Sequence, residues 1–235
     1  MSAETNSEIT NAGITRAGTV ARPTAALPKE QIVRYTFIER AYHWINAIAY
    51  TYLLLTGLAL FTPFCYWLAY VLGGPGTIRY LHPWVGLVYF FTILWMQGKW
   101  KRDMKAIPED TEWNKNIKSY VENRDENMPP QGRFNAGQKQ FWWVMFYSTF
   151  VLLITGIVMW FPEKMPHGYH WVLPITVFIH SVTALVTIAA YIIHVYMSVW
   201  MTPGSVKAMV QGTVSTAWAR THHRLWYQKM TGRKS

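Results

Sequence analysis

The sequence predicts an all-α integral membrane protein, a four-helix bundle with both termini in the cytoplasm. Three observations predict this fold. Only 14% of the 235 residues are charged and 51% are hydrophobic, whereas soluble domains usually carry about 25% charged residues. Asp, Glu, Lys and Arg are missing from four long stretches, residues 41–78, 80–98, 140–162 and 165–206. The Lys and Arg residues are also divided very unevenly among the segments that connect these stretches.

The chain begins with a segment unlike the rest. Residues 1–33 are rich in Ala, Thr, Ser and Pro and have no apolar run like that of a cleaved signal peptide. We therefore expect a flexible tail there. The single cysteine, Cys65, excludes an internal disulfide framework and a cysteine-only zinc or iron–sulfur site. The sequence has no C-x-x-C-H motif for covalently attached haem.

Four transmembrane helices are expected within residues 34–205, at about 41–62, 80–98, 140–161 and 172–201. An apolar run of about 18 or more residues is typical of such a helix, and a segment in lipid must satisfy its own backbone hydrogen bonds. Tyr and Trp residues near the ends of these runs favour the membrane interface. The last helix would be about 45 Å long, longer than the roughly 30 Å hydrocarbon core, so it must tilt or protrude.

The basic residues predict the orientation of these helices. The N-terminal segment to Arg40 has five Lys and Arg residues, the loop 99–139 has nine, and the segment from residue 202 onward has six. The loops 63–79 and 162–171 have one each. The positive-inside rule therefore places both termini, the loop 99–139 and the C-terminal tail 206–235 in the cytoplasm. Because the charge surrounds apolar spans, it indicates membrane topology and no nucleic-acid binding.

Two segments of the chain resemble each other. Residues 53–57 (Leu-Leu-Leu-Thr-Gly) match residues 152–156 (Leu-Leu-Ile-Thr-Gly), and residues 81–88 partly match residues 179–186, with a histidine at the second position of each. Two helical hairpins related by duplication would explain the match. Chance similarity between apolar segments explains it equally well.

Four of the eight histidines lie inside the four expected transmembrane helices: His43, His82, His180 and His194. An ionisable side chain in a membrane helix is costly and is a functional hypothesis by default. The other four are expected to be solvated loop or tail residues: His167, His170, His222 and His223.

Depth pairs the four intramembrane histidines. His180 and His194 are 14 residues apart, which is about 21 Å along one helix and about 40° around it. Given the direction of each helix, His43 lies at the depth of His194, and His82 at the depth of His180. Two cross-helix pairs are what two bis-histidine haems b require. Packed histidines and a proton relay are the alternatives, whereas a zinc or copper site would need more ligands close together.

The segment that leads into the third helix is a second candidate site. Asn135 could cap the helix, Gly137 permits close approach of the backbone, and Gln138 offers an amide. The segment is either a plain helix N-terminus or a pocket for a quinone head group beside the inner haem. The basic residues after the second helix are best explained by the positive-inside rule, and contact with lipid is a second explanation: Lys99, Lys101, Arg102 and Lys105.

Several motifs resemble those of one family, the cytochrome b gamma subunit of membrane-bound formate dehydrogenase. The resemblance covers about residues 33–230. It rests on residues 34–44 (Arg-Tyr-Thr-Phe-Ile-Glu-Arg-Ala-Tyr-His-Trp), 81–83 (Leu-His-Pro), 135–139 (Asn-Ala-Gly-Gln-Lys), 193–197 (Ile-His-Val-Tyr-Met) and 204–212, with Ala217-Trp218-Ala219-Arg220, His222-His223 and Trp226-Tyr227. The first 30 residues or so depart from the family pattern.

This resemblance implies a subunit of a heterotrimer in the bacterial cytoplasmic (inner) membrane, and leaves open a higher oligomer of heterotrimers. An alpha subunit with molybdenum or tungsten would oxidise formate outside. A four-cluster iron–sulfur beta subunit would pass electrons to the haem of His82 and His180, then to that of His43 and His194. Menaquinone or ubiquinone would be reduced near the inner face, at His194, Asn135, Gly137 and Gln138, contributing to protonmotive force. The alternatives are a cytochrome b subunit of a [NiFe]-hydrogenase, a redox-inactive membrane anchor and a proton-conducting transporter.

Overall fold

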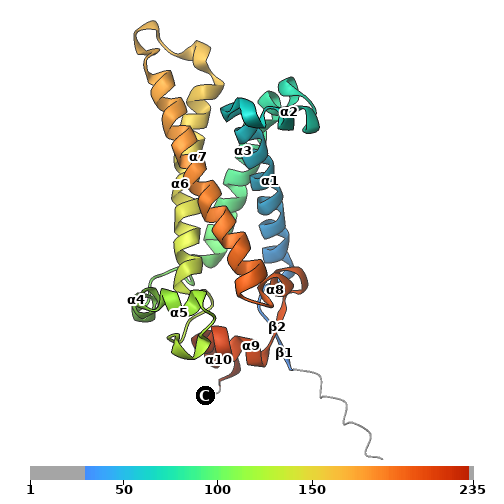
Figure 1. Cartoon of the computed structure of the whole chain (residues 1–235), viewed down its shortest axis with the longest axis vertical. Helices are drawn as coiled ribbons and strands as arrows, with labels where there is room; N and C mark the ends of the chain where they lie inside the picture. Colours follow the sequence, from blue (N-terminus) through green and yellow to red (C-terminus); the bar gives the residue numbers. More distant parts are fainter. Residues whose placement is uncertain (1–29, 233–235) are drawn as a thin grey trace, which may run out of the picture.

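Four long helices, side by side, dominate the computed structural model, which describes residues 30–232 (Figure 1). They are α1 (Phe37–Phe61), α3 (Pro75–Trp100), α6 (Ala136–Trp160) and α7 (Val172–Tyr196), and the last is followed by a π-helical turn, η5 (Met197–Met201). α1 packs mainly on α3 and α6 mainly on α7, so the chain forms two helical hairpins. α7 leans across the bundle, and its last turns approach α1 and α8 (Ser205–Gln211).

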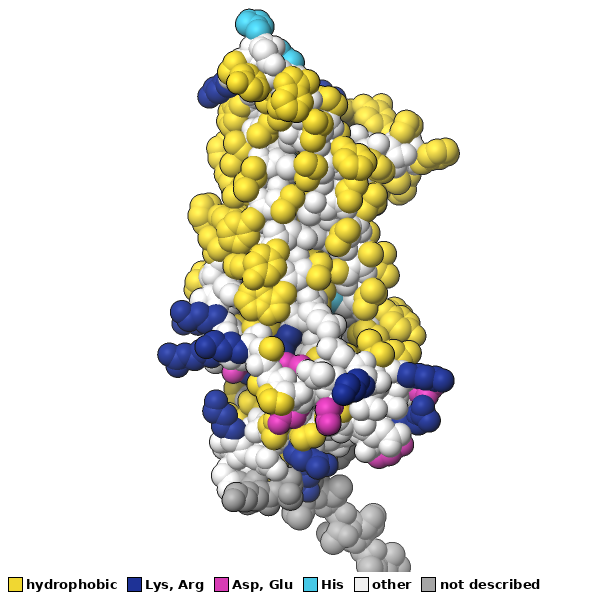
Figure 2. All heavy atoms as spheres, turned by 90° about the vertical axis from the view of Figure 1, so that its left-hand side faces the viewer, with side chains coloured by type: hydrophobic (Ala, Val, Ile, Leu, Met, Phe, Trp, Pro, Cys, Tyr) yellow, Lys and Arg dark blue, Asp and Glu magenta, His cyan; other side chains and the backbone are white. Residues whose placement is uncertain are grey.

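Three of these helices are long and apolar enough to span a membrane: α1, α6, and α7 together with η5. Most side chains in their apolar stretches are not buried within the protein, and Figure 2 shows hydrophobic side chains over the length of the bundle. The chain is therefore a transmembrane protein. α3 is equally long, at 26 residues, but contains His, Pro, Gly and several Tyr and Trp residues, which lower its hydropathy. That α3 also spans the membrane stays a prediction.

Three of the long helices, α1, α3 and α6, begin four or five residues before the predicted positions, whereas α7 begins at Val172 as expected. The reason is capping. Thr36 and Glu39 form a reciprocal capping box at the start of α1, and Asn135 and Gln138 form another at the start of α6. α3 begins with Pro75 at its first position, where the missing N–H is no loss. The prediction was wrong at these ends because it required charge-free segments, whereas a helix extends beyond the membrane.

One end of the bundle, here called the basal end, carries most of the remaining structure. The loop 99–139 folds there into α4 (Pro108–Lys115), α5 (Ile117–Val121) and a 3₁₀ turn, η2 (Asp125–Asn127). The C-terminal segment contributes α8, α9 (Thr216–His222) and α10 (Arg224–Thr231). Lys, Arg, Asp and Glu side chains gather at this end on the face that Figure 2 shows. None of these short helices was predicted.

Two short strands correct the all-α expectation. β1 (Gln31–Val33) pairs antiparallel with β2 (Thr213–Ser215), and Ile32 lies opposite Val214. The segment predicted as a flexible tail, residues 1–33, is therefore ordered at residues 31–33, whereas residues 1–29 lie outside the described part. This two-stranded sheet joins the segment before α1 to the C-terminal segment at the basal end.

The opposite, distal end holds the two short connections. α1 leads into the 3₁₀ turn η1 (Pro63–Cys65) and α2 (Trp67–Val71), whereas α6 and α7 are joined by the 3₁₀ turns η3 (Pro162–Lys164) and η4 (His167–Tyr169). α2 carries a small buried cluster against α3, made of Ala59, Ala69 and Ile78.

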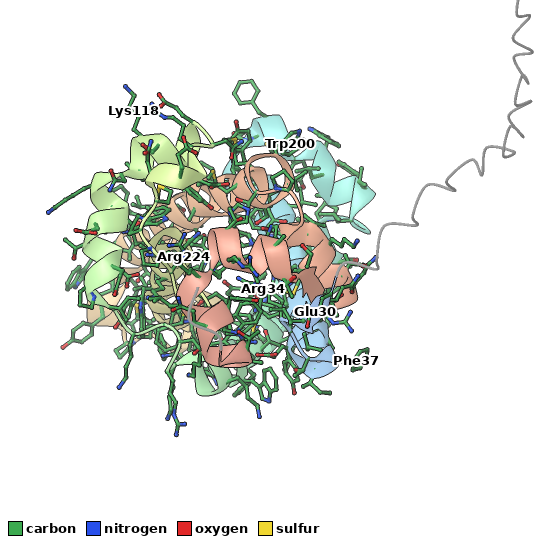
Figure 3. All side chains as sticks on the ribbon, turned by 90° about the horizontal axis from the view of Figure 1, so that it is seen from below. Glu30, Arg34, Phe37, Lys118, Trp200 and Arg224 are labelled. Carbon is green, nitrogen blue, oxygen red and sulfur yellow. The ribbon has the colours of Figure 1, made fainter. Side chains whose placement is uncertain are left out.

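The larger core lies in the basal half. Trp100, Phe134 and Trp142 pack edge to face or tilted against one another there. Glu39 of α1 accepts hydrogen bonds from Trp100 Nε1 at 2.7 Å and from Arg133 Nη2 at 2.8 Å. This charge-assisted network ties the start of α1 to the end of α3 and to the segment before α6. Seen from below, Arg34 lies beneath the bundle among the C-terminal helices, whereas Lys118 and Phe37 lie at the periphery (Figure 3).

Candidate functional site

The first histidine pair lies toward the basal end, where α7 approaches α1. The ring centres of His43 and His194 are 6.4 Å apart, with the planes inclined by 48°. Phe141 of α6 stacks on His194, at 4.2 Å between ring centres. The Nδ1 atom of His43 is buried and makes no hydrogen bond within the described part of the chain. α1 and α7 therefore hold two imidazoles close together and tilted against each other, beside an aromatic ring.

The other two histidines, His82 and His180, lie toward the distal end, and a threonine holds each of them in the same way. Nδ1 of His82, on α3, is 2.7 Å from Oγ1 of Thr56 on α1. Nδ1 of His180, on α7, is 2.8 Å from Oγ1 of Thr155 on α6. Each hairpin thus presents one histidine that is fixed by a threonine of its own first helix.

These side chains fit haem b as a ligand set. Two imidazoles on opposite sides of one metal ion have ring centres about 6 Å apart, because each metal–nitrogen bond is about 2 Å long. The separation of His43 and His194 is close to this value. The buried Nδ1 of His43 has no hydrogen-bond partner in the described part of the chain, and such an exception among buried polar atoms is typical of a site that lacks an occupant. No group of three or more His, Cys, Asp or Glu residues that could hold a metal ion occurs within residues 30–232.

Tyrosines fill the bundle between the two histidine levels. The ring of Tyr50 lies 5.6 Å from that of Tyr89 and 4.9 Å from that of Tyr191. These tyrosines were not predicted as part of the site. The sequence contained a signal, because Tyr50 follows His43 and Tyr89 follows His82 by seven residues, almost two helical turns, so that each tyrosine shares the helix face of its histidine.

The residues of the second candidate site serve the packing of α6. Oδ1 of Asn135 accepts a hydrogen bond from the backbone N–H of Gln138, and Oε1 of Gln138 accepts one from that of Asn135. A Cβ atom on Gly137 would lie 2.8 Å from the ring of Trp113 in α4. Lys139 forms a buried ion pair with Asp110, with N–O distances of 2.8 and 3.0 Å. The structure thus supports a helix N-terminus held against α4.

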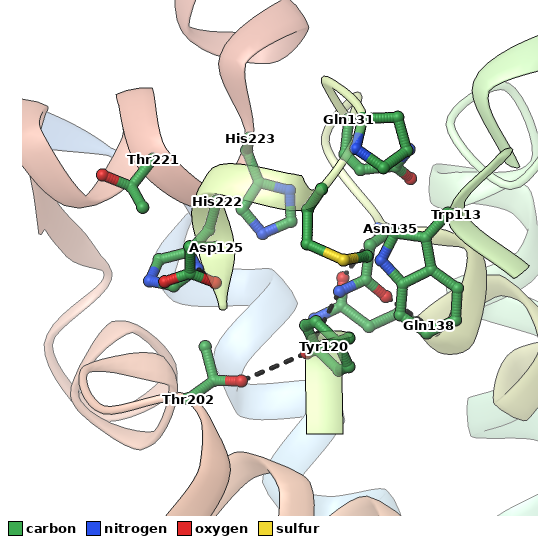
Figure 4. A pocket seen from close by; sticks show the side chains of 12 residues that line it. Trp113, Tyr120, Asp125, Gln131, Asn135, Gln138, Thr202, Thr221, His222 and His223 are labelled. Atoms are coloured by element: carbon green, nitrogen blue, oxygen red, sulfur yellow. Dashed lines mark hydrogen bonds and ion pairs between the residues drawn. The ribbon is translucent and has the colours of Figure 1, made fainter. Parts of the chain in front are cut away.

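A polar pocket opens next to this segment (Figure 4). Asn135 and Gln138 line it, whereas Gly137 and His194 are not among its lining residues. Its free volume is about 20 Å³, which is room for about one water molecule. The Nδ2 group of Asn135 donates a hydrogen bond to the hydroxyl of Tyr120, which partly closes the pocket. In this conformation the pocket is too small for a quinone ring.

One histidine contradicts the expectation that the last four are solvated. His223 is only 2% exposed. It contacts the carbonyl of Gly132 through Nδ1 at 2.7 Å and Nη2 of Arg34 through Nε2 at 2.9 Å. Burial, followed by the positive charge of Arg34, holds the pKa of His223 well below its ordinary value. The prediction was wrong because sequence alone did not show that the C-terminal segment folds under the bundle.

The other three fit the expectation better. His167 and His170 are exposed. His222 is partly buried, and its Nδ1 lies 3.7 Å from a carboxylate oxygen of Asp125, within reach of an ion pair when the ring is protonated.

Comparison with known proteins agrees with this geometry. The family model for prokaryotic cytochrome b561 matches residues 34–212. The cytochrome b556(Fdn) subunit of the nitrate-inducible formate dehydrogenase of Escherichia coli K12 is 33% identical over 201 residues, covering 86% of this chain and 92% of the relative. The cytochrome b556(fdo) subunit of formate dehydrogenase from the same strain is 34% identical and is covered to 94%. A formate dehydrogenase cytochrome b556 subunit of Haemophilus influenzae is 32% identical and is covered to 83%. This chain therefore belongs to the prokaryotic cytochrome b561 family and is a relative of the cytochrome b556 subunits of formate dehydrogenases.

Proposed function

We propose that this chain is the dihaem cytochrome b subunit of a formate dehydrogenase complex in the bacterial cytoplasmic membrane. The observation that carries the proposal is the approach of His43 to His194, whose ring centres are 6.4 Å apart, together with the two threonine-bound imidazoles of His82 and His180. Membership of a cytochrome b family implies haem b, and the relatives are named as formate dehydrogenase subunits. Two pairs of ligands at separate levels account for two such groups.

His43 and His194 would hold the inner haem, and His82 and His180 the outer haem, each through a neutral imidazole nitrogen. Haem b supplies reversible one-electron transfer, and two in series would connect an iron–sulfur beta subunit at the distal end with quinone at the basal end. The apolar helices keep water from the ligands, and the stacked Phe141 limits rotation of His194.

The orientation follows from the charges. With α3 as a fourth span, the basal end, which includes the ordered part of both terminal segments, would face the cytoplasm, because 20 of the 22 Lys and Arg residues belong to the segments on that side. The distal end would then face outward, where the beta subunit and an alpha subunit with molybdenum or tungsten would bind. Formate oxidation outside and proton uptake inside would together contribute to protonmotive force.

Quinone, either menaquinone or ubiquinone, would bind at the basal end near Asn135, Gly137, Gln138 and His194. The polar pocket beside α6 supports this location, because it lies at the basal end and is lined by a carboxylate and an imidazole, Asp125 and His222. Entry of a quinone ring would require the segment of α4 and α5 to move away from α6.

The haem proposal is tested on the complex purified with its partner subunits. We expect a pyridine haemochrome assay to give two haems b per chain. His43→Ala and His194→Ala should remove the same haem, and His82→Ala the other. His167→Ala, an exposed histidine in an outer loop, is the matched control and should remove neither.

The same preparation separates the alternatives. Absence of haem from a folded chain would favour the membrane anchor or the proton-conducting transporter. Two haems with a [NiFe]-hydrogenase as the co-purified partner would instead identify the chain as the cytochrome b subunit of that hydrogenase. If His43→Ala and His194→Ala removed different haems, the pairing would be wrong.

The quinone proposal needs a variant that separates ligand binding from capping. Asn135→Ser keeps a good N-cap but lacks the amide, whereas Asn135→Ala loses both. We expect both variants to slow menaquinone or ubiquinone reduction while both haems remain. Wild-type turnover in Asn135→Ser would limit the role of Asn135 to the helix cap.

A further inference from the structure

We propose that Thr56 and Thr155 are positioning residues that orient His82 and His180 and tune the outer haem. The proposal rests on the function proposed above, because it assumes that these two histidines bind iron. Thr56 is completely buried, and Thr155 is 8% exposed. Each contacts the Nδ1 atom of one histidine, at 2.7 and 2.8 Å.

The threonine hydroxyls determine which ring nitrogen carries the proton. Oγ1 of Thr56 lies 2.7 Å from the carbonyl oxygen of Tyr52, and Oγ1 of Thr155 lies 2.6 Å from that of Val151. A carbonyl can only accept, so the single hydroxyl proton is donated to it. The hydroxyl oxygen must then accept a hydrogen bond from the imidazole Nδ1–H. This leaves the lone pair on Nε2, the nitrogen available to iron.

The adjacent glycines complete the arrangement. A Cβ atom on Gly57 would lie 3.7 Å from Cε1 of His82, and one on Gly156 would lie 3.6 Å from Cε1 of His180. In each Thr-Gly pair the threonine binds the imidazole and the glycine leaves the space beside the ring free of a side chain. The similar segments 53–57 and 152–156 each supply a threonine that binds the histidine of the other helix in the same hairpin. This shared arrangement favours duplication over chance similarity.

In the inner pair, at least one histidine lacks a hydrogen bond of this kind. Nδ1 of His43 is buried without a hydrogen-bond partner in the described part of the chain. A hydrogen bond from Nδ1–H raises the basicity of the imidazole as a ligand, and a chain of hydrogen bonds that ends on a carbonyl strengthens the effect. A more basic ligand stabilises ferric over ferrous iron. The threonines should therefore lower the reduction potential of the outer haem relative to the inner one, which favours electron flow inward.

The test replaces the hydroxyls while keeping side-chain shape. Thr56→Val and Thr155→Val are compared with the wild type in the purified complex by redox titration of the haem absorbance, together with the pyridine haemochrome assay. The His82→Ala variant identifies which titration wave belongs to the outer haem. We expect each Val variant to raise the potential of the outer haem, the double variant to raise it further, and the inner haem to stay unchanged. Thr56→Ser and Thr155→Ser should restore the wild-type potential.

Thr149→Val is the matched control. Thr149 is a buried threonine of α6 whose hydroxyl donates to the carbonyl of Met145 at 2.7 Å, and no imidazole is among its hydrogen-bond partners in the described part. An unchanged outer potential in the Val variants, or an equal shift in Thr149→Val, would overturn the proposal. If the Val variants lost the outer haem, retention in the Ser variants would support positioning, and loss in both would overturn it. Fewer than two haems in the wild type would instead refute the proposed function.

Discussion

Replacement of Lys139 by Met is expected to loosen the packing of α4 on α6. The side chains of Lys139 and Asp110 are 7% and 12% exposed, and the ammonium group lies 2.8 and 3.0 Å from the two carboxylate oxygens. Removing one partner of a buried pair leaves the other charge without compensation, which costs about 3–5 kcal/mol. Because about 1.4 kcal/mol is a factor of ten, the population of opened α4 should rise by roughly two to four orders of magnitude.

Limited trypsin digestion of the detergent-solubilised protein measures this opening, since Lys115 lies at the end of α4. We expect cleavage between α3 and α6 to accelerate strongly in Lys139→Met. Lys118→Met is the matched control, because Lys118 is 83% exposed and its contact with Glu122 is 4.0 Å long, so its loss should cost below about 1 kcal/mol.

A second variant tests the physical reason. In the double variant Lys139→Met with Asp110→Asn, neither position carries a charge. The amide oxygen of the new Asn side chain can still accept the hydrogen bond from the backbone N–H of Ile107. Most of the lost stability should return. Equal cleavage rates for Lys139→Met and wild type, or no recovery in the double variant, would refute the argument from the buried charge.

Three further predictions concern the basal end, and thermal denaturation in detergent micelles measures each. Gly137→Ala should destabilise the protein by about 1 kcal/mol net, because the overlap with Trp113 costs about 1–3 kcal/mol and the gain in helix propensity returns about 1. Gly212→Ala should cost more, at least about 2 kcal/mol, since its φ is +85° and a Cβ would lie 2.8 Å from a backbone oxygen; a wild-type melting temperature in either variant would contradict the packing described. The depressed pKa of His223 beside Arg34 means that the unfolded chain binds the proton first, so stability should fall below about pH 6.5 by at most about 1.4 kcal/mol per unit; an equal pH dependence in His223→Gln would assign it to other groups.

The sequence predicted the features that depend on local composition. Apolar runs located the helices that the structure shows, and three of them meet the length and hydropathy expected of membrane spans. The depth of each histidine followed from its distance to the end of its run, and the structure brings His43 next to His194. Helices that span a membrane run roughly along its normal, so the residue number along such a helix predicts the depth of the residue in the membrane.

The basal end could not be predicted in the same way. Nothing local marks Trp113 as the neighbour of Gly137 or Asp110 as the partner of Lys139, because these contacts join α4 to α6 across a polar loop. The burial of His223 depends on Arg34 and Gly132, which are 189 and 91 residues away. Outside the membrane no fixed axis relates sequence to depth, and packing alone decides which polar groups meet.

The sequence alone predicted the membrane character, the approximate helices, the approach of His43 to His194 and the resemblance to a cytochrome b family. Only the tertiary structure showed that Thr56 and Thr155 contact His82 and His180, that Trp113 lies against Gly137, and that the C-terminal segment buries a histidine. The physical reason is that hydropathy and helical periodicity are properties of one segment, whereas hydrogen bonds and close packing between helices depend on their rotation and separation, which many distant contacts determine together.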